Sequence, residues 1–376
     1  MKSTLALKKV TIIGGGLSGL ITAIQLIRAN IPVKLYEKKN YPFHRVCGEY
    51  ISNETAPFLK SIGLYPEELV PAQINQFQLT STQGKSAILP LKLGGFGISR
   101  YAFDHWLYKK AMAEGVEVYT NSEVNQLSFS EDEFTYTVND QHQTADVIIG
   151  AFGKRSRLDK SMNRSFIKKR SPYLGIKYHI KLDQPADLIS LHNFKNGYCG
   201  ISQVENGVVN LCYLSHRSNL KEKGHIKQME EEILSKNPFL KDIFHRAEFL
   251  FDQPETINEI SFETKAPIEN HVLMCGDSAG MITPLCGNGM AMAIHSSKML
   301  SELLIPYILN AKASRILLEQ QYTSAWRNQF AKRLWAGRQL QKLFGSTQAS
   351  DTTVWIANHL KPVANYLVSK THGKQF

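Results

Sequence analysis

Cysteine is scarce in this chain of 376 residues, and its five copies show neither a C-x-x-C pair nor a regular spacing. Zinc sites and disulfide frameworks need paired or regularly spaced cysteines, so neither is expected. The twelve histidines include no H-E-x-x-H motif, and we expect no metal site.

Long apolar runs are missing as well. None reaches the roughly 18 residues that a membrane-spanning helix needs. The composition, with 43% apolar and 20% charged residues, is that of a globular protein. The first three residues lead directly into an expected strand, so no cleaved signal peptide is expected, and a cytoplasmic location is the prediction.

Acidic residues are in deficit, with 33 Asp and Glu against 44 Lys and Arg, a net charge of +11. Residues 311–376 hold ten basic and two acidic residues, a net of +8. This tail also carries large apolar side chains, namely Trp326, Trp335, Leu340, Phe344 and Trp355. It could rest on an anionic membrane surface, or be the solvated face of helices that pack on the body. No nucleic-acid-binding motif is present, so nucleic acid is not an expected partner.

A glycine-rich loop stands between an expected buried strand at 9–13 and an expected helix at 20–29. A second strand at 33–36 then ends at Glu37. In this Rossmann pattern, Gly14 permits a tight turn, Gly16 lets the backbone approach a pyrophosphate, and Gly19 allows close packing of helix on strand. Glu37 can accept hydrogen bonds from ribose hydroxyls, and its charge disfavours the extra phosphate of NADP at this site. The predicted cofactor contacts in this part are Gly14, Gly16, Leu17, Ser18, Gly19, Glu37 and Lys38.

A second block, at 271–293, contains a short apolar run, Asp277, a turn at Pro284 and a Gly287-Asn288-Gly289 entry into an apolar helix. Together with the glycine loop, this block makes FAD the expected dinucleotide. The segments 43–50 (F-H-R-V-C-G-E-Y) and 98–104 (I-S-R-Y-A-F-D) complete the pattern. With these four segments the chain resembles FAD-dependent oxidoreductases of the p-hydroxybenzoate hydroxylase fold, and most of all their geranylgeranyl-reductase and flavin-dependent halogenase-monooxygenase group.

The resemblance implies roles for particular residues. Asp277 would bond the ribityl chain, Arg45 and Arg100 would contact the cofactor, and Val124 would lie against the adenine. The helix start at Gly287, Asn288 and Gly289 would face the flavin N1/O2 side, where a helix N-terminus stabilises the anionic reduced ring. Cys47 would lie beside the isoalloxazine, where a thiol can gate the pocket or donate a proton; the alternative is a small residue in a tight loop.

One departure concerns Phe152, in the segment 145–157. It stands where aromatic hydroxylases of this resemblance carry an aspartate that helps to organise FAD and NADPH. This difference weakens the case for an orthodox NADPH-dependent hydroxylase.

The predicted fold is a two-domain α/β (α+β) protein. A discontinuous Rossmann-like FAD domain would comprise 1–71, 97–157 and 266–310. An antiparallel-sheet substrate domain would comprise 72–96 and 158–265, and 311–376 would form C-terminal helices. Since no second G-x-G-x-x-G exists, a separate nicotinamide domain is not expected.

Side chains of the presumed substrate sheet are candidates for proton transfer, although a structural role is open for each. The pocket candidates are His179, His192, Tyr198, Tyr213 and Pro284, with Tyr178 beside them. Glu49 is interpreted as the cap of a helix near 52–60 or as a surface residue, with an acid role as the alternative. The basic run between 154 and 170 either steers NADPH or a pyrophosphate substrate, or is a solvated loop.

Two functions remain open at this point. One is reduction of C=C bonds in an isoprenoid or similarly apolar substrate, with NAD(P)H as the electron donor. The other is hydroxylation of an aromatic or polyketide substrate by a flavin monooxygenase. Halogenation is disfavoured because the W-x-W-x-I-P segment is absent. A non-catalytic flavin-binding protein is disfavoured because the cofactor motifs are complete.

Overall fold

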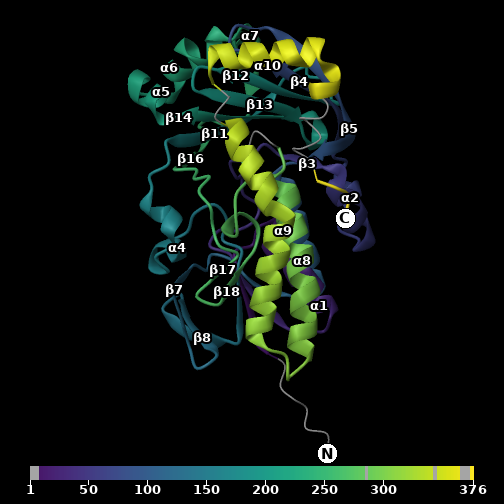
Figure 1. Ribbon diagram of the computed structural model, residues 1–376, viewed down its shortest axis with the longest axis vertical. Helices are drawn as coiled ribbons and strands as arrows, with labels where there is room; N and C mark the ends of the chain where they lie inside the picture. Colours follow the sequence, from purple (N-terminus) through teal and green to yellow (C-terminus); the bar gives the residue numbers. More distant parts are fainter. Residues whose placement is uncertain (1–7, 284–286, 342–344, 365–372) are drawn as a thin grey trace, which may run out of the picture.

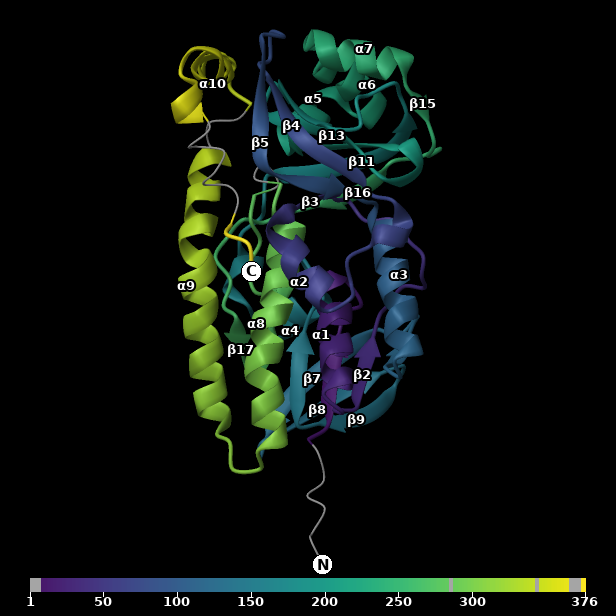
Figure 2. The same ribbon diagram turned by 90° about the vertical axis from the view of Figure 1, so that its right-hand side faces the viewer.

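The computed structural model describes residues 8–283, 287–341, 345–364 and 373–376. Figure 1 shows two parts stacked along the long axis, with a large sheet at one end and a nucleotide-binding part at the other. Two long helices run beside the nucleotide-binding part, as the perpendicular view in Figure 2 also shows.

A six-stranded sheet with the order β17-β18-β10-β1-β2-β6 forms the centre of the nucleotide-binding part. Its strands are β1 (Val10–Ile13), β2 (Val33–Tyr36), β6 (Glu117–Tyr119), β10 (Val147–Gly150), β17 (Ile268–Glu269) and β18 (Val272–Met274). All neighbours are parallel except β17 and β18. The central strands β1 and β10 are buried along their whole length, as expected for parallel strands covered on both faces.

Helices and a small sheet cover this centre. The covering helices include α1 (Leu17–Arg28), α3 (Arg100–Ala113), α4 (Arg157–Ser161) and α8 (Gly289–Leu309), with α2 (Ala56–Ser61) close by. An antiparallel three-stranded sheet consists of β7 (Val124–Ser130), β8 (Glu133–Val138) and β9 (Gln141–Ala145).

The large sheet has nine strands, in the order β15-β11-β14-β13-β12-β4-β5-β3, with β16 also paired to β11. Their bounds are β3 (Tyr50–Ser52), β4 (Ala72–Thr80), β5 (Ser86–Gly97), β11 (Tyr173–Lys181), β12 (Leu188–Phe194), β13 (Gly197–Gln203), β14 (Val209–His216), β15 (Glu248–Phe249) and β16 (Glu255–Asn258). All pairs are antiparallel except β12 with β4. Helices α5 (Arg217–Lys223), α6 (Ile226–Glu232) and α7 (Pro238–Arg246) pack on its outer face (Figure 1).

Short 3-10 turns complete the described chain, namely η1 (Asn53–Thr55), η2 (Glu67–Leu69), η3 (Ser165–Lys168), η4 (Glu205–Gly207), η5 (Leu234–Lys236) and η6 (Gly276–Ser278). The last two helices are α9 (Arg315–Gln341), which runs antiparallel beside α8, and α10 (Thr347–His359), which lies across the large sheet (Figure 2).

The C-terminal segment differs from a uniform amphipathic tail. Trp326 and Phe330 of α9 are buried in the core of the nucleotide-binding part, whereas Trp335 and Trp355 are 59% and 53% exposed. The long helix α9 is therefore a structural part of the fold, although it exposes Ile316 and Leu317 near its start and Trp335 near its end. Within the described part of the chain, no helix is both long and apolar enough to cross a membrane.

The predicted α/β fold class is confirmed. The predicted domain ranges remain predictions, and the sheets divide the chain slightly differently at two places. Strand β3, which lies within 1–71, pairs with β5 of the large sheet. Leu158 and Met162, which lie within 158–265, pack in the core of the nucleotide-binding part.

Candidate functional site

The glycine loop follows β1 and leaves its outer side open. A Cβ on Gly14 would collide with the carbonyl oxygen of Ala151, and one on Gly19 would collide with the carbonyl oxygen of Gly14. A Cβ on Gly16 would meet only a guanidinium nitrogen of Arg100, 3.3 Å away. Gly14 and Gly19 are thus required by packing, whereas Gly16 keeps space for a ligand to approach the backbone.

Glu37 lies directly after β2 and is buried. Its carboxylate accepts hydrogen bonds from the backbone N–H groups of Gly15 at 2.9 Å and Lys39 at 3.0 Å, and it pairs with Arg45 Nη2 at 3.1 Å. The predicted ribose-binding carboxylate is therefore fixed against the glycine loop by contacts within the protein.

Arg100 and Arg45 meet at the carboxylate of Asp104, which is buried at the start of α3. The distances are 2.7 Å and 2.6 Å from Arg100 Nε and Nη2, and 3.2 Å from Arg45 Nε. Burial lowers the pKa of Arg100, but the Asp104 carboxylate outweighs it and raises the pKa overall. A permanently charged guanidinium beside Gly16 suits the binding of a pyrophosphate.

The 271–293 block lies against the same loop. Gly276 donates its N–H to Ser296 Oγ at 3.0 Å, and a Cβ on it would lie 2.6 Å from Ser18 Oγ. Asp277 follows at once, and its carbonyl accepts from Lys265 Nζ at 2.8 Å. A Cβ on Gly287 would lie 3.3 Å from the ring of Tyr50.

Asn288, which is buried, precedes the first residue of α8, Gly289. The predicted contact at Pro284 lies outside the described residues. Val124 is buried at the start of β7, two residues after Ser122, whose N–H donates to the Glu37 carbonyl at 2.9 Å. The structure thus brings Gly276 against Ser18 and Ser122 against Glu37, while the cofactor roles of Gly287 to Gly289 and of the exposed Lys38 stay predictions.

Glu49 differs from its predicted place at a helix cap or on the surface. Its carboxylate is fully buried and pairs with Lys177 Nζ at 2.5 Å and His179 Nε2 at 2.7 Å. It also accepts the backbone N–H of Arg100 at 2.7 Å. The helix-cap interpretation is wrong because Ser52, not Glu49, accepts the N–H at the start of η1.

Acid should unfold the protein partly through Glu49. Burial raises the pKa of this carboxyl, but Lys177 and His179 together lower it by more than burial raises it. The resulting pKa is about 2. Between the ordinary value of 4.5 and about 2, the unfolded chain binds a proton that the folded chain does not. The stability that Glu49 contributes is therefore present above this window and lost as the pH falls through it.

The measurement is urea unfolding at about pH 5 and about pH 3. We expect Glu49→Gln to lose less stability between the two values than the wild type. Glu230→Gln is the control. Burial raises the pKa of Glu230, so its contribution to the change of stability with pH has the opposite sign to that of Glu49. Equal losses of stability on acidification in the wild type and in Glu49→Gln would contradict the interpretation that Glu49 stabilises the protein as a charged carboxylate.

The predicted pocket residues of the large sheet do not lie together. His179 faces Glu49, and Tyr198 packs in a cluster with Leu214 and Met281. On the other face, Tyr213 donates to Glu230 at 2.5 Å, as Tyr178 does at 3.1 Å.

His192 bonds to Thr80 at 3.0 Å and stacks on Phe239 of α7. Burial lowers the pKa of His192 to about 3. Because side chains alternate along a strand, His192 and Tyr213 point toward the outer helices and cannot share one pocket with His179. Grouping them in one pocket was therefore wrong.

Cys47 is half-buried on the segment that carries Glu49. Its carbonyl accepts from Asn210 Nδ2 of β14 at 3.2 Å, and the neighbouring Val46 carbonyl accepts from Lys154 Nζ at 2.8 Å. The segment is thus attached to the large sheet. A chemical role for the thiol stays a prediction.

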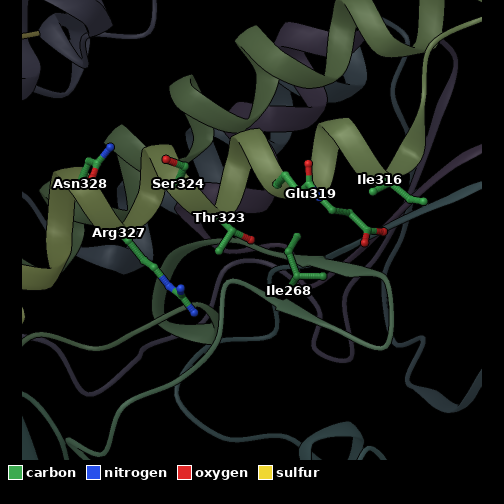
Figure 3. A pocket seen from close by; sticks show the side chains of 8 residues that line it. Ile268, Ile316, Glu319, Thr323, Ser324, Arg327 and Asn328 are labelled. Atoms are coloured by element: carbon green, nitrogen blue, oxygen red, sulfur yellow. The ribbon is translucent and has the colours of Figure 1, made fainter.

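Among the described residues, one hollow adjoins the predicted cofactor site at Lys38 and another lies away from it. A cleft of about 390 Å³ is lined by Lys38, Glu123, Arg155, Ser156, Arg157 and Lys160. Within the basic run, Arg164 is buried against Asp159 and Lys154 bonds to Val46, so this run is partly structural. A groove of about 570 Å³ separates α9 from β17, with Thr323 and Glu319 facing Ile268 (Figure 3). It contains none of the predicted site residues.

Sequence reasoning missed Lys177, Asp104 and Arg164 as organising residues. Lys177 had a detectable signal, because it is a charged residue inside an otherwise apolar strand and such a residue needs a buried partner. Asp104 belonged to a recognised segment, but nothing in its spacing showed that it joins two arginines.

Comparisons with known proteins agree with this geometry. The family model for the FAD binding domain matches residues 8–336. Digeranylgeranylglycerophospholipid reductase 2 of Methanopyrus kandleri is 22% identical over 352 residues, covering 89% of this chain and 86% of that protein. Tryptophan 2-halogenase of Chondromyces crocatus is 21% identical over 384 residues, covering 94% and 70%.

Two solved structures show the same fold. The geranylgeranyl bacteriochlorophyll reductase-like protein of Thermoplasma acidophilum has a TM-score of 0.79 at 17% identity, covering 98% of this chain and 96% of that one. The flavin-dependent halogenase CmlS has a TM-score of 0.76 at 20% identity, and the match covers 88% of this chain and 64% of that one.

The open backbone at Gly16, the carboxylate after β2 and the two arginines fit FAD, in agreement with the family match over residues 8–336. The chain belongs to the FAD binding domain family and is a flavin-dependent oxidoreductase.

Proposed function

We propose that the protein reduces a C=C bond in an apolar, isoprenoid-type substrate, using FAD that NAD(P)H reduces. The observation that carries the proposal is the position of Cys47. Its segment lies between Tyr50, whose ring would be 3.3 Å from a Cβ on Gly287, and Asn210 of the large sheet. A thiol at this junction would lie next to both the flavin ring and the substrate if they bind as proposed.

Reduced FAD, when bound, supplies a hydride. The second hydrogen must then come from a protein group as a proton, so that NAD(P)H, one proton and the C=C bond yield NAD(P)⁺ and the saturated bond. Cys47 can donate that proton and recover it from solvent, since it is only half-buried. The N-terminus of α8, if it faces the flavin as the resemblance implies, would stabilise negative charge on the ring.

The test is anaerobic turnover with polyprenyl alcohols and their diphosphates, followed by mass spectrometry. We expect products heavier by two hydrogens for each bond reduced. Cys47→Ala should lower turnover at least about ten-fold while its flavin is reduced at the wild-type rate. Products formed only with oxygen and containing an added oxygen atom would overturn the proposal.

The second candidate is a flavin-dependent aromatic monooxygenase. The similarity to a tryptophan halogenase favours a reaction of the reduced flavin with oxygen. Phe152, which replaces an acid by the resemblance described above, argues against it. Oxygen consumption stimulated by a phenolic substrate is the result that would support this candidate.

We also propose that the end of α9 and α10 rest on an anionic membrane surface. Trp335 and Trp355 are exposed there, and so are Leu360 and Val363 just beyond α10. Exposed Lys332 accompanies them. Interfacial tryptophans with basic neighbours are typical of surfaces that bind anionic lipid.

The measurement is co-sedimentation with vesicles of phosphatidylglycerol and phosphatidylcholine. Binding should require the anionic lipid, weaken with salt, and fall at least several-fold in the double variant Trp335→Ala/Trp355→Ala. Tyr119→Ala removes an exposed aromatic side chain from β6, far from this surface in the sequence, and should bind as the wild type does. Salt-independent binding, or equal binding by both variants, would contradict the proposal.

A further inference from the structure

Glu49 joins three elements that are far apart in the sequence. Its Oε1 accepts from the backbone N–H of Arg100, the first residue of α3, and from Lys177 Nζ of β11. Its Oε2 lies 2.7 Å from His179 Nε2, also on β11. Both carboxylate oxygens are thus engaged, and they connect the nucleotide-binding part directly to the large sheet.

On the cofactor side, the connection reaches the glycine loop through Arg100. The bond from Glu49 fixes the Arg100 backbone, and Asp104 fixes its guanidinium. That guanidinium is the group that a Cβ on Gly16 would meet. An anionic ligand that binds the Arg100 guanidinium beside Gly16 restrains Arg100. It therefore also restrains the hydrogen bond between the Arg100 backbone and Glu49.

On the sheet side, the connection involves two neighbouring strands. Lys177 and His179 are two residues apart on β11 and point to the same face. Asn210 of β14 pairs in register with His179 and bonds the Cys47 carbonyl. Val46 packs against Gly175, where a Cβ would lie 3.0 Å from its Cγ1. Residues 46–49 are thus attached to the sheet at several points.

The backbone conformation of Glu49 also indicates that this residue is held in place by its surroundings. Its φ is +54°, in the left-handed region that residues with a side chain rarely adopt. Such a conformation persists when surrounding contacts hold it, as the bond from the Ile98 N–H to the Glu49 carbonyl does here at 3.0 Å. Buried charge pairs are also a costly way to gain stability, so their use points to fixing one particular arrangement.

We propose that Glu49 is a positioning residue that couples occupancy of the cofactor site to the order of the large sheet. A phosphate-bearing ligand at Gly16 immobilises Arg100, and Glu49 passes this restraint to Lys177 and His179. Residues 46–49, with Cys47, are then held in place on β11 and β14. The inference rests on the proposed function only in requiring that FAD occupies the glycine-loop site.

Hydrogen–deuterium exchange of the full-length protein, with and without FAD, tests the coupling. In the wild type, FAD should slow exchange in peptides of the glycine loop and also in peptides covering 44–52, 173–181 and 209–216. In Glu49→Gln, it should slow exchange in the glycine loop alone. Glu230→Gln is the matched control, because Glu230 is buried on the opposite face of the same sheet and should leave the coupling intact.

Two further variants test the coupling if the Glu49→Gln protein does not fold. His179→Leu removes one donor and keeps the pair with Lys177, so the protection of 173–181 should fall at least two-fold. Glu49→Gln/Lys177→Met removes both buried charges, and its coupling should be lost even if its stability is restored. If the role of Glu49 were purely structural, the double variant would regain the coupling when it regains stability.

The outcomes separate this inference from the proposed function. A wild-type protein that does not bind FAD would contradict the proposed function. A wild type that binds FAD without protecting 173–181, or a folded Glu49→Gln protein with wild-type protection there, would overturn the coupling alone.

Discussion

Replacing Gly16 with alanine is expected to weaken FAD binding strongly while the protein stays folded. The added methyl group would meet only the Arg100 guanidinium at 3.3 Å, which can move aside. It would, however, fill the space that a pyrophosphate needs to reach the N–H groups at the start of α1. We expect the Kd for FAD to rise at least about 100-fold, because a phosphate displaced from these N–H groups loses several hydrogen bonds.

Fluorescence titration with FAD and thermal unfolding of the apoprotein measure the two sides of this prediction. Gly200→Ala is the control, since its Cβ would make an ordinary contact of 3.6 Å with the Cys212 carbonyl oxygen, far from the glycine loop. That variant should bind FAD as the wild type does. A Gly16→Ala protein with unchanged affinity would place the cofactor elsewhere.

Asp159→Asn is expected to destabilise the protein by about 3–5 kcal/mol, the usual effect of removing one partner from a buried ion pair. Asp159 and Arg164 are both buried and lie 2.8 Å apart. Arg164 also donates to the carbonyls of Ser278 and Ala266, and so attaches this region to the Asp277 turn. Without the carboxylate, the guanidinium loses its nearest counter-ion while still buried.

Urea unfolding measures this effect. The matched control is Glu123→Gln, which breaks the exposed pair with Arg157, the first residue of α4. Exposed pairs contribute about 0–1 kcal/mol, so the control should unfold almost as the wild type does. Similar losses of unfolding free energy in both variants would show that the buried Asp159–Arg164 pair stabilises the protein no more than an exposed pair does.

The parts of the site that could be predicted from the sequence are those encoded by local pattern. The glycine loop, its flanking strand and helix, and Glu37 are contiguous, and each has a physical reason for its spacing. The Gly276-Asp277 turn and the start of α8 at Gly289 are also local signals. The structure places all of these around one open stretch of backbone.

The remainder depends on contacts between distant segments. Glu49 looked like a helix cap because the strand that supplies its side-chain partners, β11, lies about 130 residues away in the sequence. The faces of His192 and Tyr213 depend on strand order and register, which period-2 alternation alone does not define. The basic tail divides for the same reason: Trp326 is buried only because α9 packs beside α8.

The most direct test of the proposed function is to follow the flavin absorption during a single anaerobic turnover. FAD-loaded protein is reduced by NAD(P)H, freed of excess donor and mixed with geranylgeraniol or its diphosphate. The account predicts that the flavin is reoxidised by the isoprenoid without oxygen and that the product has gained two hydrogens. A flavin that stays reduced with every isoprenoid until oxygen is admitted would contradict it.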